Sequence, residues 1–535
     1  MRVSSQGPGS SRRYFFFSSL LVMAGLSLTP KFGATWSQNA NVNAAPPTQD
    51  SACREFGPKG CLELALQAMG GRAQLETVRN LRLDEMGHTA LMEQSYRQDP
   101  FITSYEHIKE TIDFEHGRVH RETHGNWPES DPGQSSFDLT LIADAAGGVY
   151  HTAQGDNPCS LADLDSVRHG LALGPARVLL TALGAPDLHF GEPEMIRATT
   201  HASVAFTWQG IPVRILINPF NHLPDAIETI RTFHDFWYFW GDVRQRIYFE
   251  NWEVFKGVVY PTNVVEERNG ALWRSTQILN FEMNVAADDA LFHMETAAAA
   301  KSAEGKGWDR PFQATHATDL APGITLFEGA WNSTIIKQDD GVYILEAPIS
   351  GTYTQGVIDE AKKRYPDIPI KGVLSTSDSW PHTGGVRQSV ALGLPVFILD
   401  LNQSILDRII AAPHTMQPDL LAQAPKKADW RFVSQKVVVG SGANRAELYP
   451  LRGASTERQY MVYFPEHYLL YASDTLVLND NGSLYDPELM REVSEAVTRE
   501  HVSVTTVFAM HQAPVPWKQV ETLVHAGMAP AAPKS

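Results

Sequence analysis

Cysteine and positive charge are both scarce in this sequence. Three Cys among 535 residues are too few for a disulfide scaffold or for a zinc cluster built on thiolates. The 44 Lys and Arg residues are outnumbered by 61 Asp and Glu, which gives a net charge of −17. That balance argues against a nucleic-acid partner, because phosphate contacts need clustered cations.

The composition also excludes a disordered chain. Hydrophobic residues make up 43% of the sequence and charged residues 20%, which supplies enough apolar material for packed cores. At roughly 150 residues per domain, the chain is long enough for two or three domains.

Long apolar runs are lacking as well. A membrane-spanning helix needs about 20 apolar residues, and the run Leu20–Leu26 is much shorter than that. It follows Arg12 and Arg13 and a group of aromatic residues, an order that resembles a bacterial twin-arginine signal peptide. An ordinary secretory leader is the alternative. We expect residues 1–45 to be a signal peptide and the mature protein to be periplasmic or secreted, without a transmembrane span.

The three cysteines allow one local disulfide. Cys53 and Cys61 lie close together in the sequence just after the expected leader. In an oxidising compartment they would pair and leave Cys159 unpaired. Three unreactive thiols are the alternative, and both remain open from the sequence.

Residues 52–294 predict a β-rich N-terminal domain with helices. Leu62–Met69 is typical of a helix, and the two glycines after it are typical of a helix end. A second helix is expected near Pro175–Leu183. The rest consists of short alternating runs, and Asn269-Gly270 between two of them is the strongest short-range hairpin signal. These patterns predict a meander of antiparallel strands.

The N-terminal domain also contains a run of aromatic residues at Phe233–Trp240. Filling the core of a sheet is the simplest role for them. Consecutive side chains on a strand point to opposite faces, however, so some of them must cover a cleft or the domain interface. The half-open sheet with a helix loosely resembles bacterial lipoprotein-carrier folds, which accept acyl chains.

A change of pattern divides the chain near residue 300. Residues 295–313 begin with small residues and few large apolar ones, which is typical of a linker. Beyond it, strands at Gly372–Ser375 and Val396–Leu399 enclose a helix at Gly385–Leu392. Strands that alternate with helices at this spacing predict a layered α/β domain over residues 314–527.

This second domain resembles the metallo-β-lactamase family. The resemblance lies in Gly323–Phe327, in Asp340–Pro348 and in Ile370–Thr376 followed by His382–Gly385. It runs from about residue 318 to residue 525. It implies a four-layer αβ/βα sandwich, so that the whole chain is of the α+β class.

The family holds one or two zinc ions with a His-x-His-x-Asp-His loop, a later His, an Asp after a strand and a final His. In this sequence Ser377 and Ser379 stand at the first two histidine positions of the loop, Pro381 stands at the aspartate position, and Ser455 replaces the later histidine. Serine is a poor zinc ligand. The resemblance therefore implies that the first metal site is absent.

The second metal site keeps three of its residues. His382, Asp474 and His511 match the family's ligands, and each would follow the end of a strand. Two imidazoles and one carboxylate suit one zinc ion, or iron or manganese, with open positions. Asp378, inside the altered loop, is a candidate general base, and Glu346 is expected to brace the loop.

The resemblance implies a periplasmic hydrolase with one metal ion, which would activate water for attack on an ester, amide or phosphate. The alternative is a catalytically inactive domain of the same fold that acts as an envelope binding module for an apolar ligand or a protein partner.

Replacing Arg12 and Arg13 by Lys is expected to abolish export, because the twin-arginine pathway recognises the guanidinium pair and not charge alone. Cell fractionation measures the exported share of the protein. Normal export of the double-Lys variant would assign the leader to the general secretory class.

Overall fold

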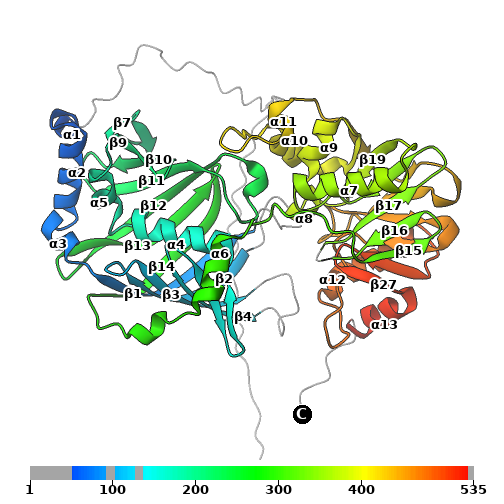
Figure 1. Cartoon of the computed structure of the whole chain (residues 1–535), viewed down its shortest axis with the longest axis horizontal. Coiled ribbons are helices and arrows are strands. Elements are labelled where there is room, and N and C mark those ends of the chain that lie inside the picture. The colour runs from blue at the N-terminus through cyan, green and yellow to red at the C-terminus, as the bar shows by residue number, and fades with distance from the viewer. Residues whose placement is uncertain (1–50, 92–102, 127–135, 330, 528–535) are drawn as a thin grey trace, which may run out of the picture. The chain divides into compact units, whose positions relative to one another are not determined.

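The computed structural model describes residues 51–91, 103–126, 136–329 and 331–527 (Figure 1). The leader expected at residues 1–45 lies outside them. The described chain is α+β, with large antiparallel sheets and several helices. Among these helices none has the length and apolar character needed to span a bilayer.

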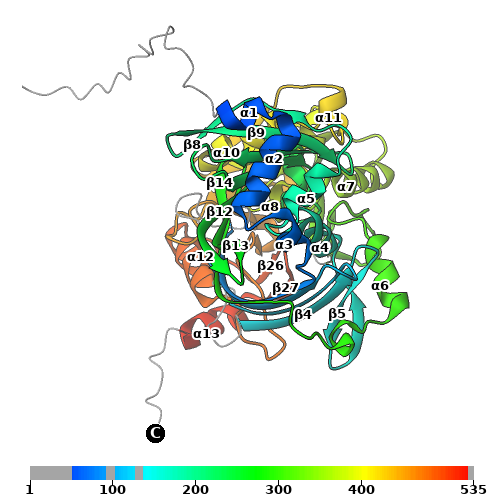
Figure 2. The ribbon, with the colours of Figure 1, turned by 90° about the vertical axis from the view of Figure 1, so that its left-hand side faces the viewer.

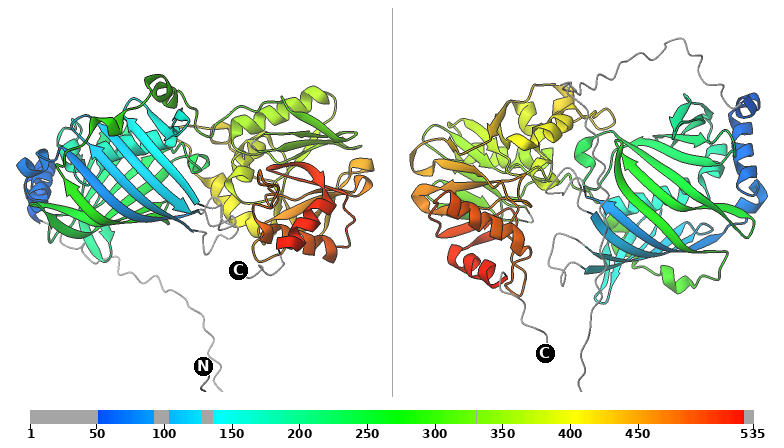
Figure 3. Two further views of the ribbon diagram at one scale, coloured as in Figure 1. Left: turned by 90° about the horizontal axis from the view of Figure 1, so that it is seen from below. Right: turned by 180° about the vertical axis from the view of Figure 1, so that it is seen from behind.

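The described part of residues 51–303 is built on one large antiparallel sheet, which Figures 2 and 3 show as strongly curved. Its strands are β1 (Asn80–Ala90), β2 (Thr103–Asp113), β3 (Arg118–Asn126), β4 (Ser136–Asp144), β5 (Gly148–Thr152), β6 (Gly155–Pro158), β7 (His189–Phe190), β8 (Glu194–Ile196), β9 (Thr199–Trp208), β10 (Ile211–Ile217), β11 (Pro224–Arg231), β12 (Val243–Phe255), β13 (Val258–Arg268) and β14 (Ala271–Met283). Their order is β6-β5-β4-β3-β2-β1-β14-β13-β12-β11-β10-β9-β7, with β8 beside β9. The predicted meander is therefore confirmed.

The hairpin predicted at Asn269-Gly270 joins β13 to β14. Both residues have positive φ, +50° and +82°, which is the backbone that a two-residue hairpin turn with the twist of its strands requires. Glycine adopts this conformation without strain and asparagine tolerates it.

Helices cover part of this sheet. They are α1 (Ser51–Glu55), α2 (Gly57–Ala68), α3 (Arg72–Glu76), α4 (Leu161–Leu173), α5 (Val178–Leu183) and α6 (Thr296–Ala303), with short turns η1 (Tyr238–Trp240) and η2 (Asp289–Phe292). The sequence predicted α2 and α5 but not α4, which begins at the N-cap Ser160 and packs against β3 and β4. Cys53 and Cys61 form a disulfide, and Cys159 is free and buried.

The aromatic run Phe233–Trp240 is a turn that ends in η1 and is not a strand. Four of its rings lie in an apolar core together with side chains of residues 327–421. Phe236 stacks on Trp380 with ring centroids 4.6 Å apart. Of the roles expected for this run, covering the domain interface is the one observed: the run packs against the second half of the chain.

Residues 295–313, expected as a linker, include the helix α6. Ala298, Ala299 and Ser302 of this helix are buried, and α6 packs against β5 and β6. Ser302 Oγ accepts a hydrogen bond from Gly148 N at 2.9 Å and donates one to Ala299 O at 2.7 Å. The start of the segment is therefore attached to the large sheet.

The second half contains two further sheets. The first consists of β15 (Ala317–Ala321), β16 (Ile324–Phe327), β17 (Ser333–Lys337), β18 (Val342–Leu345), β19 (Ile370–Leu374), β20 (Val396–Leu399) and β21 (Trp430–Val433), in this order. The second consists of β22 (Val437–Val439), β23 (Ala446–Pro450), β24 (Tyr460–Phe464), β25 (Leu469–Tyr471), β26 (Thr506–Ala509) and β27 (Gln512–Pro516). Strands β18 to β21 are parallel to one another, and so are β25 and β26.

Apolar cores connect these sheets to each other and to their helices. The helices are α7 (Gly351–Arg364), α8 (Trp380–Thr383), α9 (Val386–Leu392), α10 (Gln403–Ala411), α11 (Leu420–Gln423), α12 (Pro487–Arg499) and α13 (Trp517–Gly527), with the short turns η3 (Asp400–Asn402), η4 (Gly442–Asn444) and η5 (Pro465–His467). One core combines side chains of both sheets. A second packs α7, α9 and α10 on the first sheet, and a third packs α12 and α13 on the second.

Ser302→Ala is expected to lower the free energy of unfolding by about 1–3 kcal/mol, because it leaves the buried Gly148 N–H without an acceptor. Urea denaturation measures the change, with the exposed neighbour in Lys301→Ala as the matched control. Equal stability of the two variants would contradict the docking of α6 on β5.

Candidate functional site

Three residues predicted as metal ligands come from three different segments. His382 lies in α8, Asp474 shortly after β25 and His511 shortly after β26. Because β25 and β26 are parallel neighbours, the residues after their carboxyl ends lie at the same edge of the sheet. The strand-end placement expected from the sequence thus holds for Asp474 and His511 but is wrong for His382, which lies in the short helix α8.

The Asp474 carboxylate lies between the two imidazoles. Its Oδ2 is 3.6 Å from His382 Nε2, and its Oδ1 is 3.1 Å from His511 Nε2. The His382 side chain is fully buried, whereas 23% of the Asp474 side chain and 29% of the His511 side chain are exposed. The group is therefore closed at His382 and open to solvent at His511.

Glu346 holds the other side of His382. It follows β18, is fully buried, and places Oε2 2.9 Å from His382 Nδ1. Its Oε1 accepts hydrogen bonds from Thr376 N at 3.1 Å and from Thr376 Oγ1 at 2.5 Å. The sequence predicted a loop brace at Glu346 but not its contact with His382. A buried carboxylate directly after an apolar strand was the available signal.

These contacts set the protonation of the group. Burial opposes a charge on His382, but Glu346 and Asp474 outweigh it and raise the pKa of His382 to about 10. Burial alone would raise the pKa of Asp474, yet His511 and His382 hold it well below its usual value. At neutral pH, an imidazolium therefore lies between two carboxylates.

The backbone is strained on both sides of the group. Glu346 has φ of +64° and Ser473, the residue before Asp474, has φ of +58°. Such a conformation costs a residue other than glycine about 1–3 kcal/mol. Ser473 Oγ and Thr376 Oγ1 are 2.7 Å apart, so both strained residues contact Thr376. Surrounding contacts hold the two acidic residues in place at this cost.

The serines at the expected histidine positions make other contacts. Ser379 Oγ donates to Asp474 Oδ2 at 3.4 Å, and Ser379 N donates to Ser377 Oγ at 3.2 Å. Ser455 N donates to the Glu492 carboxylate. These serines therefore take part in hydrogen bonds within the protein. Asp378 is buried in the same loop, and its role as general base stays a prediction.

The metal implied by the resemblance fits the site in its chemistry only. His382 Nε2 is buried without a hydrogen-bond partner and faces Asp474, and imidazole with carboxylate suits zinc. Over residues 51–91, 103–126, 136–329 and 331–527, however, no three or more His, Cys, Asp or Glu side chains form a group that could hold a metal ion. His382 lies close to Asp474, and Asp474 lies close to His511. The three side chains together do not form a metal-holding group.

Comparisons with known proteins agree only in part with the expected family. No family model and no curated protein matches the chain. Solved structures with partial likeness include DIM-1 metallo-β-lactamase, with a TM-score of 0.31 and 14% identity over 40% of this chain and 97% of that one. The metallo-β-lactamase from Hirschia baltica has a TM-score of 0.31 and 15% identity, over 40% and 97%.

A different enzyme is also among these structures. The stereoselective inverting sec-alkylsulfatase Pisa1 from Pseudomonas sp. has a TM-score of 0.30 and 16% identity over 39% of this chain. The chain spans only 40% of that enzyme. The neighbours are thus metallo-β-lactamase-fold proteins and alkylsulfatases, at low identity and low coverage. TM-scores of this size carry no argument about activity.

His382→Gln is expected to lower the free energy of unfolding by about 3–5 kcal/mol, because the fully buried Glu346 and the mostly buried Asp474 would lose the cation between them. The pKa of His382 rises from 6.5 to about 10 on folding. Its stabilising effect is therefore complete below its unfolded pKa and disappears as the pH rises through 10.

Urea denaturation near about pH 6 and about pH 11 tests both statements. The difference between wild type and His382→Gln is expected to shrink at the higher pH. His525→Gln, at an exposed histidine, is the matched control. An equally large difference at both pH values would show that the charge of His382 does not stabilise the fold.

Proposed function

We propose that the second half of the chain is an exported hydrolase of the metallo-β-lactamase fold with one reaction centre at Asp474. One observation carries the proposal: the Asp474 carboxylate lies 3.6 Å and 3.1 Å from the Nε2 atoms of His382 and His511. The packing of helices on the outer faces of two sheets that share a core supports the four-layer sandwich.

Each residue of the centre has a distinct task in this proposal. Glu346 fixes the ring of His382 through Nδ1 and orients Nε2 toward Asp474. His511 is partly exposed and is the residue of the centre that a substrate reaches. Asp474 holds His511 in one orientation, as a carboxylate does for a catalytic histidine.

One divalent ion would be held by His382, Asp474 and His511. When bound, such an ion acts as a Lewis acid that polarises a carbonyl or phosphoryl oxygen or a water molecule. Binding requires the loss of a proton from His382, so the affinity is expected to rise with pH. The serines at positions 377, 379 and 455 exclude a second ion, because neutral hydroxyls are poor zinc ligands.

A second candidate function follows from the same charges. The imidazolium of His382 already pairs with both Glu346 and Asp474 without a metal, and a complete metal-holding group is absent from the described residues. The alternative is a domain that keeps this ion cluster as a structural element and binds a ligand or protein partner in the envelope.

Elemental analysis of natively exported protein separates the two functions. The hydrolase proposal predicts one equivalent of metal or less per chain, and reduced metal content together with reduced ester, amide or phosphate hydrolysis in His511→Ala. His525→Ala, at an exposed histidine outside the site, is the matched control and is expected to behave as wild type.

Three results would contradict the hydrolase proposal. Metal-free protein that remains metal-free and inactive after incubation with zinc, iron or manganese would favour the binding function. Full metal content in His511→Ala would show that His511 is not a ligand. Two equivalents of tightly bound metal would show that the serines do not mark a lost site.

A further inference from the structure

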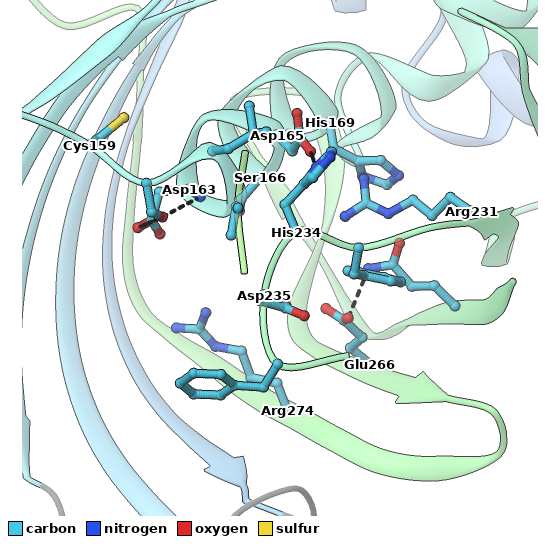
Figure 4. A pocket seen from close by; sticks show the side chains of 18 of the residues that line it. Cys159, Asp163, Asp165, Ser166, His169, Arg231, His234, Asp235, Glu266 and Arg274 are labelled. Carbon is cyan, nitrogen blue, oxygen red and sulfur yellow. Dashed lines mark hydrogen bonds and ion pairs between the residues drawn. The ribbon is translucent and has the colours of Figure 1, made fainter. Parts of the chain in front are cut away.

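The β-rich half contains a cavity of about 780 Å³ on the helix-covered side of the curved sheet (Figure 4). Its walls come from β11 to β14, from α4, and from the segment that follows α6. This volume is in the range of sites that enclose a drug-sized molecule. None of the residues of the proposed reaction centre lines it.

The carboxylates that line this cavity already have partners in the protein. The pairs are Asp163 with Tyr150 and Ser160, Asp165 with His234 and Arg168, and Asp235 and Glu266 with Arg268. Figure 4 shows Asp165 beside His234 and the group around Glu266. Each of these carboxylates therefore already has a hydrogen-bond or ion-pair partner within the protein.

Several cations that line the cavity have no such partner. Four of these cations form no ion pair within the described ranges: Arg231, Arg310, Lys301 and Lys306. The guanidinium of Arg231 lies 4.2 Å from the centre of the Phe233 ring, and its Nε is buried without a hydrogen-bond partner. A guanidinium held in place by an aromatic ring and lacking a carboxylate is suited to an anion.

The protein groups around Arg231 disfavour its positive charge. Burial and then the neighbouring Arg268 lower the pKa of Arg231, and they outweigh the opposite effects of Glu266, Asp165 and Asp235. An anion beside Arg231 would supply the missing compensation. The uncompensated positive charge is therefore local to the Arg231 guanidinium. The chain as a whole is negative, with a net charge of −17.

His169 adds a second polar group beside Arg231. It lines the cavity from α4, only 7% of it is exposed, and its Nε2 is buried without a hydrogen-bond partner. Burial and Arg231 lower its pKa to about 3, so the imidazole is neutral. Figure 4 shows His169 and Arg231 side by side. A neutral imidazole can supply one N–H to a bound oxyanion.

The remaining wall is apolar. Leu173 of α4, Ile247 and Phe249 of β12 and Val264 of β13 line the cavity, and the ring of Trp308 stands at the segment after α6. A small inorganic ion would leave this surface in contact with water. A ligand with an apolar body would bury this surface, which the hydrophobic effect favours.

We propose that this cavity binds an amphipathic organic anion, with its acidic head group on Arg231 and His169 and its apolar body against the wall of β12, β13 and α4. Sulfonate, sulfate, carboxylate and phosphate head groups share the required chemistry, since each presents oxygen acceptors to a guanidinium. The site lies in the β-rich half and is independent of the hydrolase proposal.

The test compares two fluorescent probes that differ in charge. 8-Anilinonaphthalene-1-sulfonate carries an acidic head on an aryl body, and N-phenyl-1-naphthylamine has the same aryl skeleton without the sulfonate. Titration of the full mature chain is expected to show one saturable sulfonate site. Arg231→Gln is expected to weaken sulfonate binding about tenfold, as for loss of one charged hydrogen bond, and to leave the neutral probe unchanged.

Matched variants separate the site from general effects. Arg244→Gln changes an exposed arginine of the same sheet that does not line the cavity, and it is expected to bind both probes as wild type. Arg310→Gln, at an exposed position of the cavity rim, is expected to weaken sulfonate binding by a smaller factor. It also keeps the test valid if Arg231→Gln does not fold, which circular dichroism detects.

Three outcomes would overturn the proposal. Equal binding of both probes to wild type and Arg231→Gln would make the cavity an apolar site. Equal loss of both probes would assign a structural role to Arg231. Absence of saturable sulfonate binding to folded wild-type protein would exclude the site. Competition by an alkyl carboxylate, an alkyl sulfate and an alkyl phosphate then identifies the preferred head group.

Discussion

A buried ion cluster determines the arrangement of the second half of the chain. His382 is fully buried between Glu346 and Asp474, and each of these charges would be costly to bury alone. The three residues come from β18, from α8 and from the end of β25. The cluster therefore requires the two sheets and the loop of α8 to come together with little positional freedom.

Burying this ion cluster costs free energy, and a contribution to stability alone does not explain why the protein keeps it. A well-packed apolar group of the same size is often at least as stable as a buried ion pair. Here the ions also require left-handed backbone at Glu346 and Ser473, which adds strain. Strained residues and strongly shifted pKa values in one place are typical of functional sites, and the exposed edge at His511 gives this place access to solvent.

Local patterns in the sequence predicted much of the fold. The hairpin at Asn269-Gly270, the helix α9 and the strands β19 and β20 on either side of it are where turn chemistry and periodicity placed them. Helix α4 was missed because Gly170 and three charged residues weaken its apolar periodicity. The helix within residues 295–313 was missed because its buried face consists of alanine and serine, which resemble linker composition.

The contacts of the candidate site could likewise be predicted only in part from the sequence. Asp474 and His511 could be predicted as neighbours, because parallel strands place their carboxyl ends at one edge. The contact of Glu346 with His382 could not, since it depends on a left-handed residue at the end of a strand in the other sheet. The sequence marks Glu346 as a carboxylate directly after an apolar strand, but the choice of His382 as its partner is decided by tertiary structure.

Buried charges are paired at His382 in the second half of the chain, whereas one partly buried cation of the β-rich half has no ion-pair partner among the described residues. Around His382 opposite charges lie next to one another, whereas Arg231 lies against an aromatic ring and forms no ion pair among the described residues. With a net charge of −17, the long-range field of the protein repels anions, and salt screens this repulsion over roughly 10 Å. Attraction at Arg231 must therefore act at short range. An anion that overcomes the field needs apolar contacts as well as its charge, and the cavity wall offers both.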